Sequence, residues 1–329
     1  MGNKRELEGD SILACFLVSG GFRTWELAGM GEVFGKEREG MLREGDLIGI
    51  VGCSNGLRRE REGDVQKLIR VLQEMGLKVI CSDLLYAKEG VFSATGKERG
   101  EALNEMFQNQ QVKAVFDISG GDVANEVLSY VDFQSIKACP KPFWGYSDLS
   151  VILNSIYSQT NEMTFLYTIQ NLIGGHSEMQ KKWFHSSLFY GTDDLFRISW
   201  EFLRGNSMRG IVIGGNIRCF LKLAGTALMP DFNGKILFLE AHGGNEGLIA
   251  SLLAQLRCMG AFQKIKGILL GTFTQMEKQG CQPSAAELVL RATAAENLPV
   301  AVTRGIGHGS DSKCMIIGKM VTVQPSAEM

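Results

Sequence analysis

Short apolar runs alternate with amphipathic segments along most of this 329-residue chain, beginning near Asp46. The run from 47 to 51 is typical of a buried strand, and residues 64–75 place apolar side chains at the spacing of one helix face. The alternation resumes in the second half, with apolar runs at 235–240 and 299–302. Strands that alternate with helices form parallel sheets covered by helices, so the pattern predicts an α/β fold.

The pattern divides the chain into two α/β regions, and its length suits two domains of ordinary size. We predict an N-terminal parallel-sheet, Rossmann-like domain over 45–185 and a second α/β domain over 210–329. The more polar, pattern-poor segment 186–209 is interpreted as the linker. Residues 1–44 are expected to be a poorly ordered extension, with Met41 as a candidate natural start.

The composition excludes several classes of protein. A hydrophobic fraction of 45% with 21% charged residues is globular, and a net charge of −2 without a basic run argues against nucleic acid. The eight cysteines form no Cys-x-x-Cys pair or His/Cys cluster, which predicts reduced thiols and no metal site. The apolar run 11–18 is short and follows a mixed-charge segment, so we expect no export, and a spanning helix would need about 20 apolar residues. We therefore expect a cytoplasmic protein that does not bind membranes and needs no cofactor.

Residues 142–150 carry the strongest functional signal, because they run from a predicted strand into a predicted helix with Ser147 at the bend. A strand-to-helix turn exposes the side chain at the bend, and N–H groups at a helix start can bind a developing oxyanion. The pattern approaches the Gly-x-Ser-x-Gly nucleophile elbow: Gly145 and Ser147 are in register, but Leu149 occupies the position of the last glycine. This departure indicates a fold family other than the α/β-hydrolases.

A simpler alternative for this segment is that Ser147, Asp148 or Ser150 caps the following helix, since serine and aspartate are preferred N-caps. The segment alone does not separate a nucleophile from a cap. A serine nucleophile needs a base and an orienting acid elsewhere in the chain.

The chain contains four histidines that could supply the base: His176, His185, His242 and His308. We rank His308 first because it lies on a glycine-rich loop directly after an apolar run, where α/β proteins place their chemistry. His242 competes, since it stands two residues beyond Glu240, whereas His176 and His185 fall in a polar connecting stretch. Glu240 ends a buried apolar run and is the candidate acid, unless it simply reaches solvent.

Six motifs together resemble the LD-carboxypeptidases, the serine peptidase family that includes the microcin C immunity peptidases. The resemblance covers roughly residues 45 to 323, in the family's order and spacing. The motifs are Gly-Tyr-Ser-Asp-Leu-Ser from Gly145, Gly-Gly-Asn-Ile from Gly214, Leu-Phe-Leu-Glu ending at Glu240, Gln-Leu-Arg-Cys-Met-Gly from Gln255, Gly-Ile-Leu-Leu-Gly-Thr-Phe from Gly267 and Gly-His ending at His308.

This resemblance implies a catalytic triad. Ser147 would be the nucleophile, His308 the general base and then acid, and Glu240 the group that orients the imidazole. The oxyanion hole would use the backbone N–H groups of Asp148 and Gly121. The family also implies a homodimer and a reaction without a metal ion.

Two positions depart from the family pattern. Residues 119–123 read Ser-Gly-Gly-Asp-Val where members often have Arg-Gly-Gly-Tyr-Gly, which changes the expected substrate contacts near the oxyanion hole. Residues 239–241 read Leu-Glu-Ala where members often have Leu-Glu-Asp, which removes a possible second carboxylate. Neither departure affects the three proposed triad residues.

The expected substrate is a small peptide. The resemblance favours hydrolysis of the L,D-peptide bond that releases the terminal D-alanine of murein tetrapeptides in cell-wall recycling. The alternative is the immunity branch, which cleaves an amide in peptidyl or aminoacyl nucleotides and often carries extra length before Gly-Gly-Asn. Residues 164–215 are compact in this chain, which favours the carboxypeptidase.

A second class of enzyme remains as an alternative on the residues alone. The glycine-rich segment 49–56 follows the first predicted strand and could cradle a dinucleotide, with Asp83 as a ribose partner. Its spacing is Gly-x-x-Gly-x-x-x-Gly instead of Gly-x-Gly-x-x-Gly, which argues against an oxidoreductase. A non-catalytic binding module is disfavoured by the presence of all three triad residues.

Overall fold

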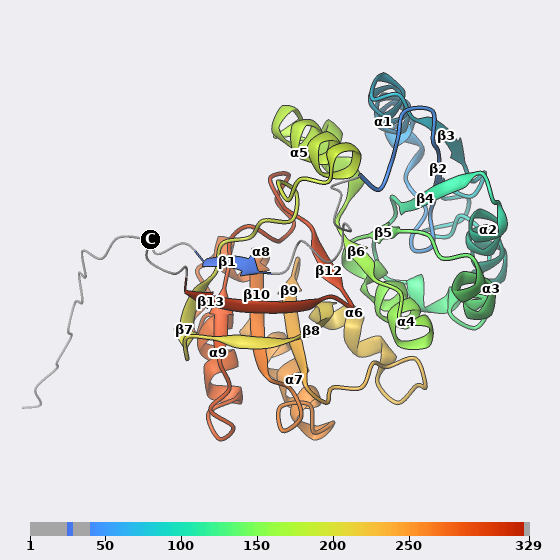
Figure 1. The fold of residues 1–329 in the computed structure, drawn as a ribbon. Coiled ribbons are helices and arrows are strands. Elements are labelled where there is room, and N and C mark those ends of the chain that lie inside the picture. The colour runs from blue at the N-terminus through green and yellow to red at the C-terminus, as the bar shows by residue number, and fades with distance from the viewer. Residues whose placement is uncertain (1–24, 29–39, 326–329) are drawn as a thin grey trace, which may run out of the picture.

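The structure is a computed structural model that describes residues 25–28 and 40–325, and two β-sheets organise it (Figure 1). Sheet A has seven strands in the order β1-β13-β8-β9-β10-β11-β7, and sheet B has six in the order β12-β6-β5-β4-β2-β3. The predicted α/β fold is therefore confirmed.

Sheet B is built mainly by the N-terminal half of the chain. Strands β2 to β6 are parallel to one another, and β12, the last in the chain, pairs antiparallel with β6. The strands are β2 (Leu47–Val51), β3 (Lys78–Cys81), β4 (Val112–Asp117), β5 (Phe143–Gly145), β6 (Thr164–Leu166) and β12 (Met315–Ile317). The helices around it are α1 (Glu62–Glu74), α2 (Gly96–Gln108), α3 (Phe133–Ala138), α4 (Ser150–Thr160) and α5 (Ser177–Tyr190).

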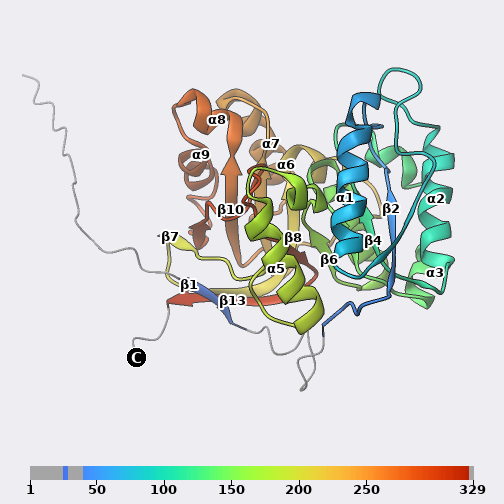
Figure 2. The same ribbon diagram turned by 90° about the horizontal axis from the view of Figure 1, so that it is seen from above.

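Successive side chains of a strand point to opposite faces of the sheet, and the two faces of sheet B pack against different helices. Phe116 on β4 belongs to one buried cluster with Leu68 of α1 and Phe184 of α5. The next residue back, Val115, belongs to the other cluster with Leu103 of α2. Helices α1 and α2 accordingly lie on opposite sides of the sheet (Figure 2).

Sheet A is built mainly by the C-terminal half. Its central strands β8, β9, β10 and β11 are parallel, and antiparallel strands extend both ends. The strands are β1 (Trp25–Ala28), β7 (Glu201–Arg204), β8 (Met208–Asn216), β9 (Lys235–Ala241), β10 (Gly267–Phe273), β11 (Val300–Val302) and β13 (Met320–Pro325). Its helices are α6 (Ile217–Phe220), α7 (Glu246–Cys258), α8 (Thr274–Gln279) and α9 (Ala285–Ala292).

The end of the chain passes between the two sheets. After β11 in sheet A the chain enters sheet B as β12 and then returns to sheet A as β13. At the return, the Gly318 N–H donates to the Val212 carbonyl at 2.8 Å, and the Val212 N–H donates to the Lys319 carbonyl at 2.9 Å. Residues of α4 and of β9 also share one hydrophobic cluster. The two sheets are therefore joined by a common core and by a crossing chain.

The predicted boundaries did not anticipate these connections. The segment 186–209, interpreted as a linker, contains the end of α5 and strand β7, which pairs with β11. Within residues 1–44, Trp25–Ala28 form β1 and pair with β13, while most of the other residues lie outside the described part. None of the helices in the described ranges is long and apolar enough to cross a membrane.

Candidate active site

Ser147 lies at the bend between β5 and α4, and its backbone is unusual. Its φ is 57°, in the left-handed region, whereas the other described non-glycine residues with positive φ are Asn161 and Asn297. Asparagine tolerates this conformation, but a serine there costs on the order of 1–3 kcal/mol and must be held by its surroundings. The neighbours on both sides, Tyr146 and Asp148, are buried. The bend at Ser147 therefore has a strained backbone, as the predicted nucleophile would require.

The helix-cap alternative for this segment is wrong. The N-cap of α4 is Leu149, without a side-chain hydrogen bond, and the short 3-10 helix η4 (Ser147–Leu149) has Tyr146 at its N-cap, also without one. The hydroxyl of Ser150 instead accepts a hydrogen bond from the Asn216 N–H at 2.9 Å. The side chains of this segment bind other parts of the molecule.

Glu240 and His308 lie against each other, although they are 68 residues apart in the chain. Nδ1 of His308 is 2.9 Å from Oε2 of Glu240, with the glutamate side chain 0% exposed and the histidine side chain 15% exposed. The alternative that Glu240 escapes to solvent is therefore wrong. Oε1 of Glu240 and both ring nitrogens of His308 are buried without a hydrogen bond of good geometry among the described residues, so the 2.9 Å approach of Nδ1 to Oε2 is a close charge contact, and Nε2 has no such contact. Since buried polar atoms are nearly always paired, Nε2 is free to bind a group that enters the site.

Tyr146 connects this pair to the bend. Its hydroxyl donates to Oε2 of Glu240 at 3.1 Å, and its ring centroid lies 4.9 Å from that of His308. Burial, reinforced by the charge of Glu240, raises the pKa of Tyr146 well above its usual value, so the phenol keeps its proton. Sequence reasoning missed this residue, although it stands directly before Ser147 in the motif.

The other three histidines take different places. His242 is exposed and its ring centroid is 4.6 Å from that of His308; burial first, and then nearby His308, lower the pKa of His242. His176 lies at the start of α5, with Nδ1 2.9 Å from the Ser310 hydroxyl, and His185 stacks on Phe189. Among the ion pairs of the described residues, only His308 supplies an imidazole to Glu240.

The loop that carries His308 packs closely on β10. A Cβ atom at Gly307 would lie 1.8 Å from Oγ1 of Thr272, so this position requires glycine because of close approach. The Thr272 N–H donates to the Ile306 carbonyl at 2.9 Å, and the Gly307 N–H donates to the Ser312 hydroxyl at 3.1 Å. The contact with β10 is therefore the physical reason for the glycine before His308.

The two candidate oxyanion donors lie in neighbouring segments. Gly121 has φ of 122° and belongs to the loop that follows β4, where the side chain of Asn55 occupies the position a Cβ would take. Asp148 follows Ser147, and its buried carboxylate accepts hydrogen bonds from the Ser54 hydroxyl at 2.6 Å and the Ala124 N–H at 2.8 Å. Through these contacts the bend is fixed to the segment that follows Gly121.

The structure argues against a dinucleotide site in the glycine-rich loop after β2. Backbone N–H groups are what such a loop offers to phosphates. Here the four N–H groups from Cys53 to Gly56 already donate within the protein. Their acceptors are the Asp117 carboxylate, the Ser119 hydroxyl, the Gly120 carbonyl and the Val91 carbonyl, in chain order.

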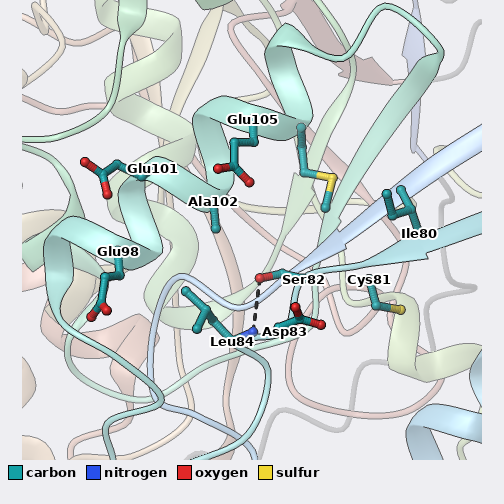
Figure 3. A pocket seen from close by; sticks show the side chains of 10 residues that line it. Ile80, Cys81, Ser82, Asp83, Leu84, Glu98, Glu101, Ala102 and Glu105 are labelled. Atoms are coloured by element: carbon teal, nitrogen blue, oxygen red, sulfur yellow. Dashed lines mark hydrogen bonds between the residues drawn. The ribbon is translucent and has the colours of Figure 1, made fainter.

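The proposed ribose partner, Asp83, lies in an acidic hollow (Figure 3). The hollow is also lined by Glu98, Glu101 and Glu105 of α2, and no basic residue lines it. Four carboxylates would repel the pyrophosphate of a dinucleotide. The described residues also contain no group of three or more His, Cys, Asp or Glu placed to hold a metal ion.

These features define an α/β protein of two sheets with a strained serine bend and a buried Glu240–His308 pair, and the comparison with protein families assigns it to a class of peptidases. The LD-carboxypeptidase N-terminal domain matches residues 48–167, and the LD-carboxypeptidase C-terminal domain matches residues 209–323. The chain therefore belongs to the LD-carboxypeptidase family.

Individual relatives come from both branches of the family. The chain is 30% identical to a probable murein peptide carboxypeptidase of Bacillus subtilis, over 70% of this chain and 73% of the relative. It is 25% identical to the microcin C7 self-immunity protein MccF of Escherichia coli, over 79% of this chain and 85% of that protein. A solved structure of MccF in complex with glutamyl sulfamoyl guanosine has the same fold, with a TM-score of 0.76 at 21% identity, covering 88% and 98% of the two chains.

Proposed function

We propose that this protein is a serine carboxypeptidase that hydrolyses the L,D-peptide bond releasing the terminal D-alanine of murein tetrapeptides. The contact between buried Glu240 and His308 carries this proposal, because it holds an imidazole whose ring centroid is 4.9 Å from that of Tyr146, the neighbour of Ser147 at the strained bend. The names of the carboxypeptidase relatives support the substrate class.

In the proposed mechanism Glu240 fixes the tautomer of His308. A carboxylate 2.9 Å from Nδ1 keeps a proton on that nitrogen, which leaves the Nε2 lone pair available as a base. The phenol of Tyr146 donates to the same carboxylate oxygen and so holds the carboxylate in place. When the imidazole becomes charged, the buried carboxylate stabilises it.

The reaction proceeds as acyl transfer. Ser147 Oγ attacks the carbonyl carbon of the scissile bond while Nε2 of His308 takes the hydroxyl proton. The oxyanion that forms is bound by the N–H groups of Gly121 and Asp148, and His308 then gives the proton to the leaving amine of D-alanine. Water, activated by His308, attacks the acyl-enzyme, and the shortened peptide leaves with restored Ser147.

The second candidate is the cleavage of an amide in a peptidyl or aminoacyl nucleotide, which would use the same three residues. The similarity to MccF over 79% of this chain favours it. Against it, residues 164–215 comprise only β6, a 3-10 helix η5 (Ile169–Ile173), α5, β7 and most of β8. All of these pack against the two sheets or their helices, so the segment supplies no additional subdomain for a nucleotide.

The experiment that separates the two candidates is mass spectrometry of the purified protein with each substrate in parallel. One reaction contains a murein tetrapeptide, and the other contains an aspartyl-adenylate amide analogue; Ser147→Ala is the control for both. Loss of one alanine from the tetrapeptide, absent in the variant, supports the carboxypeptidase. Cleavage of the nucleotide amide alone would assign the protein to the immunity branch. We further propose that the protein is cytoplasmic and forms a homodimer; light scattering of the purified protein tests the dimer.

A further inference from the structure

Two basic side chains from sheet A's half of the molecule contact the segments that carry the candidate oxyanion donors: Arg218 contacts one of them and Lys222 contacts both. Arg218 belongs to α6, and Lys222 follows in the 3-10 helix η6 (Leu221–Leu223). Nη2 of Arg218 donates to the Gly121 carbonyl at 3.0 Å, and Nη1 forms an ion pair with the Asp122 carboxylate. Nζ of Lys222 donates to the Asp122 carbonyl at 2.6 Å and forms an ion pair with the Asp148 carboxylate.

Because Asp148 is buried, its carboxylate depends on these contacts for stabilisation. Its side chain is 0% exposed, one carboxylate oxygen is taken up by Ser54 and Ala124, and the other pairs with Lys222. A buried carboxylate that loses its cationic partner is strongly destabilised, and the surrounding structure moves to rehydrate it. Because Asp148 is the neighbour of Ser147, that movement would displace the bend.

We propose that Lys222, assisted by Arg218, is a positioning residue that fixes the spacing between the two N–H groups of the oxyanion hole. This inference rests on the proposed function, because it assigns Gly121 and Asp148 as the donors. Lys222 contacts the residue after one donor and the carboxylate of the other, so a single ammonium group ties the two segments together. Oxyanion donors act only within about 2.7–3.1 Å of the oxygen they stabilise, so small shifts are costly.

The two basic residues should differ in how strongly they position the oxyanion donors. Lys222 is 19% exposed and its partner Asp148 is fully buried, whereas Arg218 and Asp122 are 47% and 60% exposed. Ion pairs that face solvent contribute little, because water and salt screen them. We therefore expect the loss of Lys222 to have the larger effect on the oxyanion hole.

An alkyl fluorophosphonate tests the inference without knowledge of the natural substrate. Ser147 Oγ attacks phosphorus, the P–F bond breaks with release of fluoride, and the hydroxyl proton passes to His308. The negative phosphoryl oxygen develops where a peptide oxyanion would, so the rate depends on the same donors. Two constants are measured for the intact protein: the affinity for the reagent and the maximal rate of Ser147 modification.

The variants are Lys222→Met, Lys222→Arg and Arg218→Met, with Lys97→Met as the matched control. Lys97 forms an exposed ion pair with Glu101 at 3.7 Å on α2. We expect Lys222→Met to lower the maximal rate about 10- to 100-fold with unchanged reagent affinity, less than the loss of a whole donor. Arg218→Met should lower the rate by a smaller factor. Lys222→Arg should recover most of the rate because it restores the charge, and Lys97→Met should react as the wild type does.

The outcomes separate the inference from the proposed function. Failure of the wild-type protein to be modified at Ser147 would refute the nucleophile assignment. Modification of wild type and Lys222→Met at equal maximal rates would overturn the positioning role and leave the nucleophile intact. Weaker reagent affinity at an unchanged rate would also overturn it, since Lys222 would then be a binding residue. The rates are expressed per folded molecule, determined by circular dichroism, so that partial unfolding does not mimic the effect.

Discussion

Two glycine-rich loops follow parallel strands of the two sheets, and they differ in how their polar groups are used. Residues 52–56 follow β2 in sheet B, and the N–H groups from Cys53 to Gly56 all donate within the protein. Residues 305–309 follow β11 in sheet A and carry His308, whose Nε2 is buried without a partner among the described residues. The comparison teaches that glycine content marks neither loop as functional, and neither does an unpaired buried polar atom, since Ser93 and Trp144 also carry one; the loop of sheet A differs because its imidazole contacts buried Glu240.

The loop after β2 has a structural role that supports the other side of the site. The buried guanidinium of Arg99 donates to the Cys53 carbonyl at 2.6 Å and to the Ser54 carbonyl at 3.1 Å. The Asn55 side chain in turn accepts from the Asp122 N–H at 2.9 Å. The loop is therefore a rigid support for the segment that contains Gly121.

The largest expected effect comes from the loop of sheet A. His308→Ala should lower turnover about a millionfold, because no other described imidazole contacts Glu240. Combining it with Ser147→Ala should add little, since the two residues act as one unit. Single and double variants are compared by kcat, with circular dichroism as the control for folding. Nearly additive losses would contradict a shared triad.

The next largest effect concerns the orientation of that imidazole. Glu240→Gln should lower kcat by about 10⁴-fold, because an amide presents a proton to Nδ1 and favours the wrong tautomer. The volume of the side chain is conserved, so the fold should be retained, which a thermal melt checks. A loss of less than tenfold in kcat would argue that Glu240 does not orient His308.

A substitution in the loop of sheet B should lower the stability of the protein and leave its activity unchanged. At Gly56 a Cβ would lie 2.6 Å from the Ala87 backbone nitrogen and 2.7 Å from its Cα, which cannot yield easily. Gly56→Ala should therefore lower the free energy of unfolding by about 1–3 kcal/mol in urea melts, while the rate of Ser147 phosphonylation per folded molecule is kept.

Gly63→Ala is the matched control for that substitution. Gly63 lies in the first turn of α1, and a Cβ there meets nothing within 4 Å. Its free energy of unfolding should stay the same or rise by up to about 1 kcal/mol, because alanine favours helix. Equal destabilisation by both alanines would show that the crowding at Gly56 is not the cause.

The smallest effect is expected at His242, which shares the site with His308. Burial and nearby His308 lower the pKa of His242 in the folded protein, so the unfolded chain binds more protons as the pH falls through the usual histidine value of about 6.5. This group therefore contributes stability at neutral pH that is lost toward acid. In His242→Phe the urea midpoint should fall less between about pH 7.5 and pH 5.5, by a small amount because the ring is exposed. An equal fall of the urea midpoint in the wild type and the variant would contradict this contribution of His242.

Much of the fold followed from hydrophobic patterning. Strands such as β2, β9 and β10 are short apolar runs, because parallel strands covered on both faces need apolar side chains throughout. Strand β7 was missed because Glu201–Arg204 alternates between exposed and half-buried side chains at the edge of sheet A. The crossing strand β12 was also missed, since its pairing with β6 joins segments about 150 residues apart, which no local pattern reveals.

The candidate site was also predictable from the sequence only in part. Ser147, Glu240 and His308 each stand just after or at the end of an apolar run, so position in the chain pointed to them. The choice of His308 over His242 followed from its place on a glycine-rich loop after an apolar run, and the contact with Glu240 could come only from the structure. Tyr146, Arg218 and Lys222 went unnoticed because their partners are 74 to 100 residues away.

The path of the chain from β11 through His308 into β12 bears on how the protein matures on the ribosome. A nascent chain that has emerged as far as Ile306 already contains Ser147 and Glu240, yet sheet B still lacks its edge strand and the site lacks its imidazole. Contacts between distant segments form late in folding. Under the proposed mechanism, hydrolysis therefore begins only after translation has passed β12, so truncated translation products carry the nucleophile without being active.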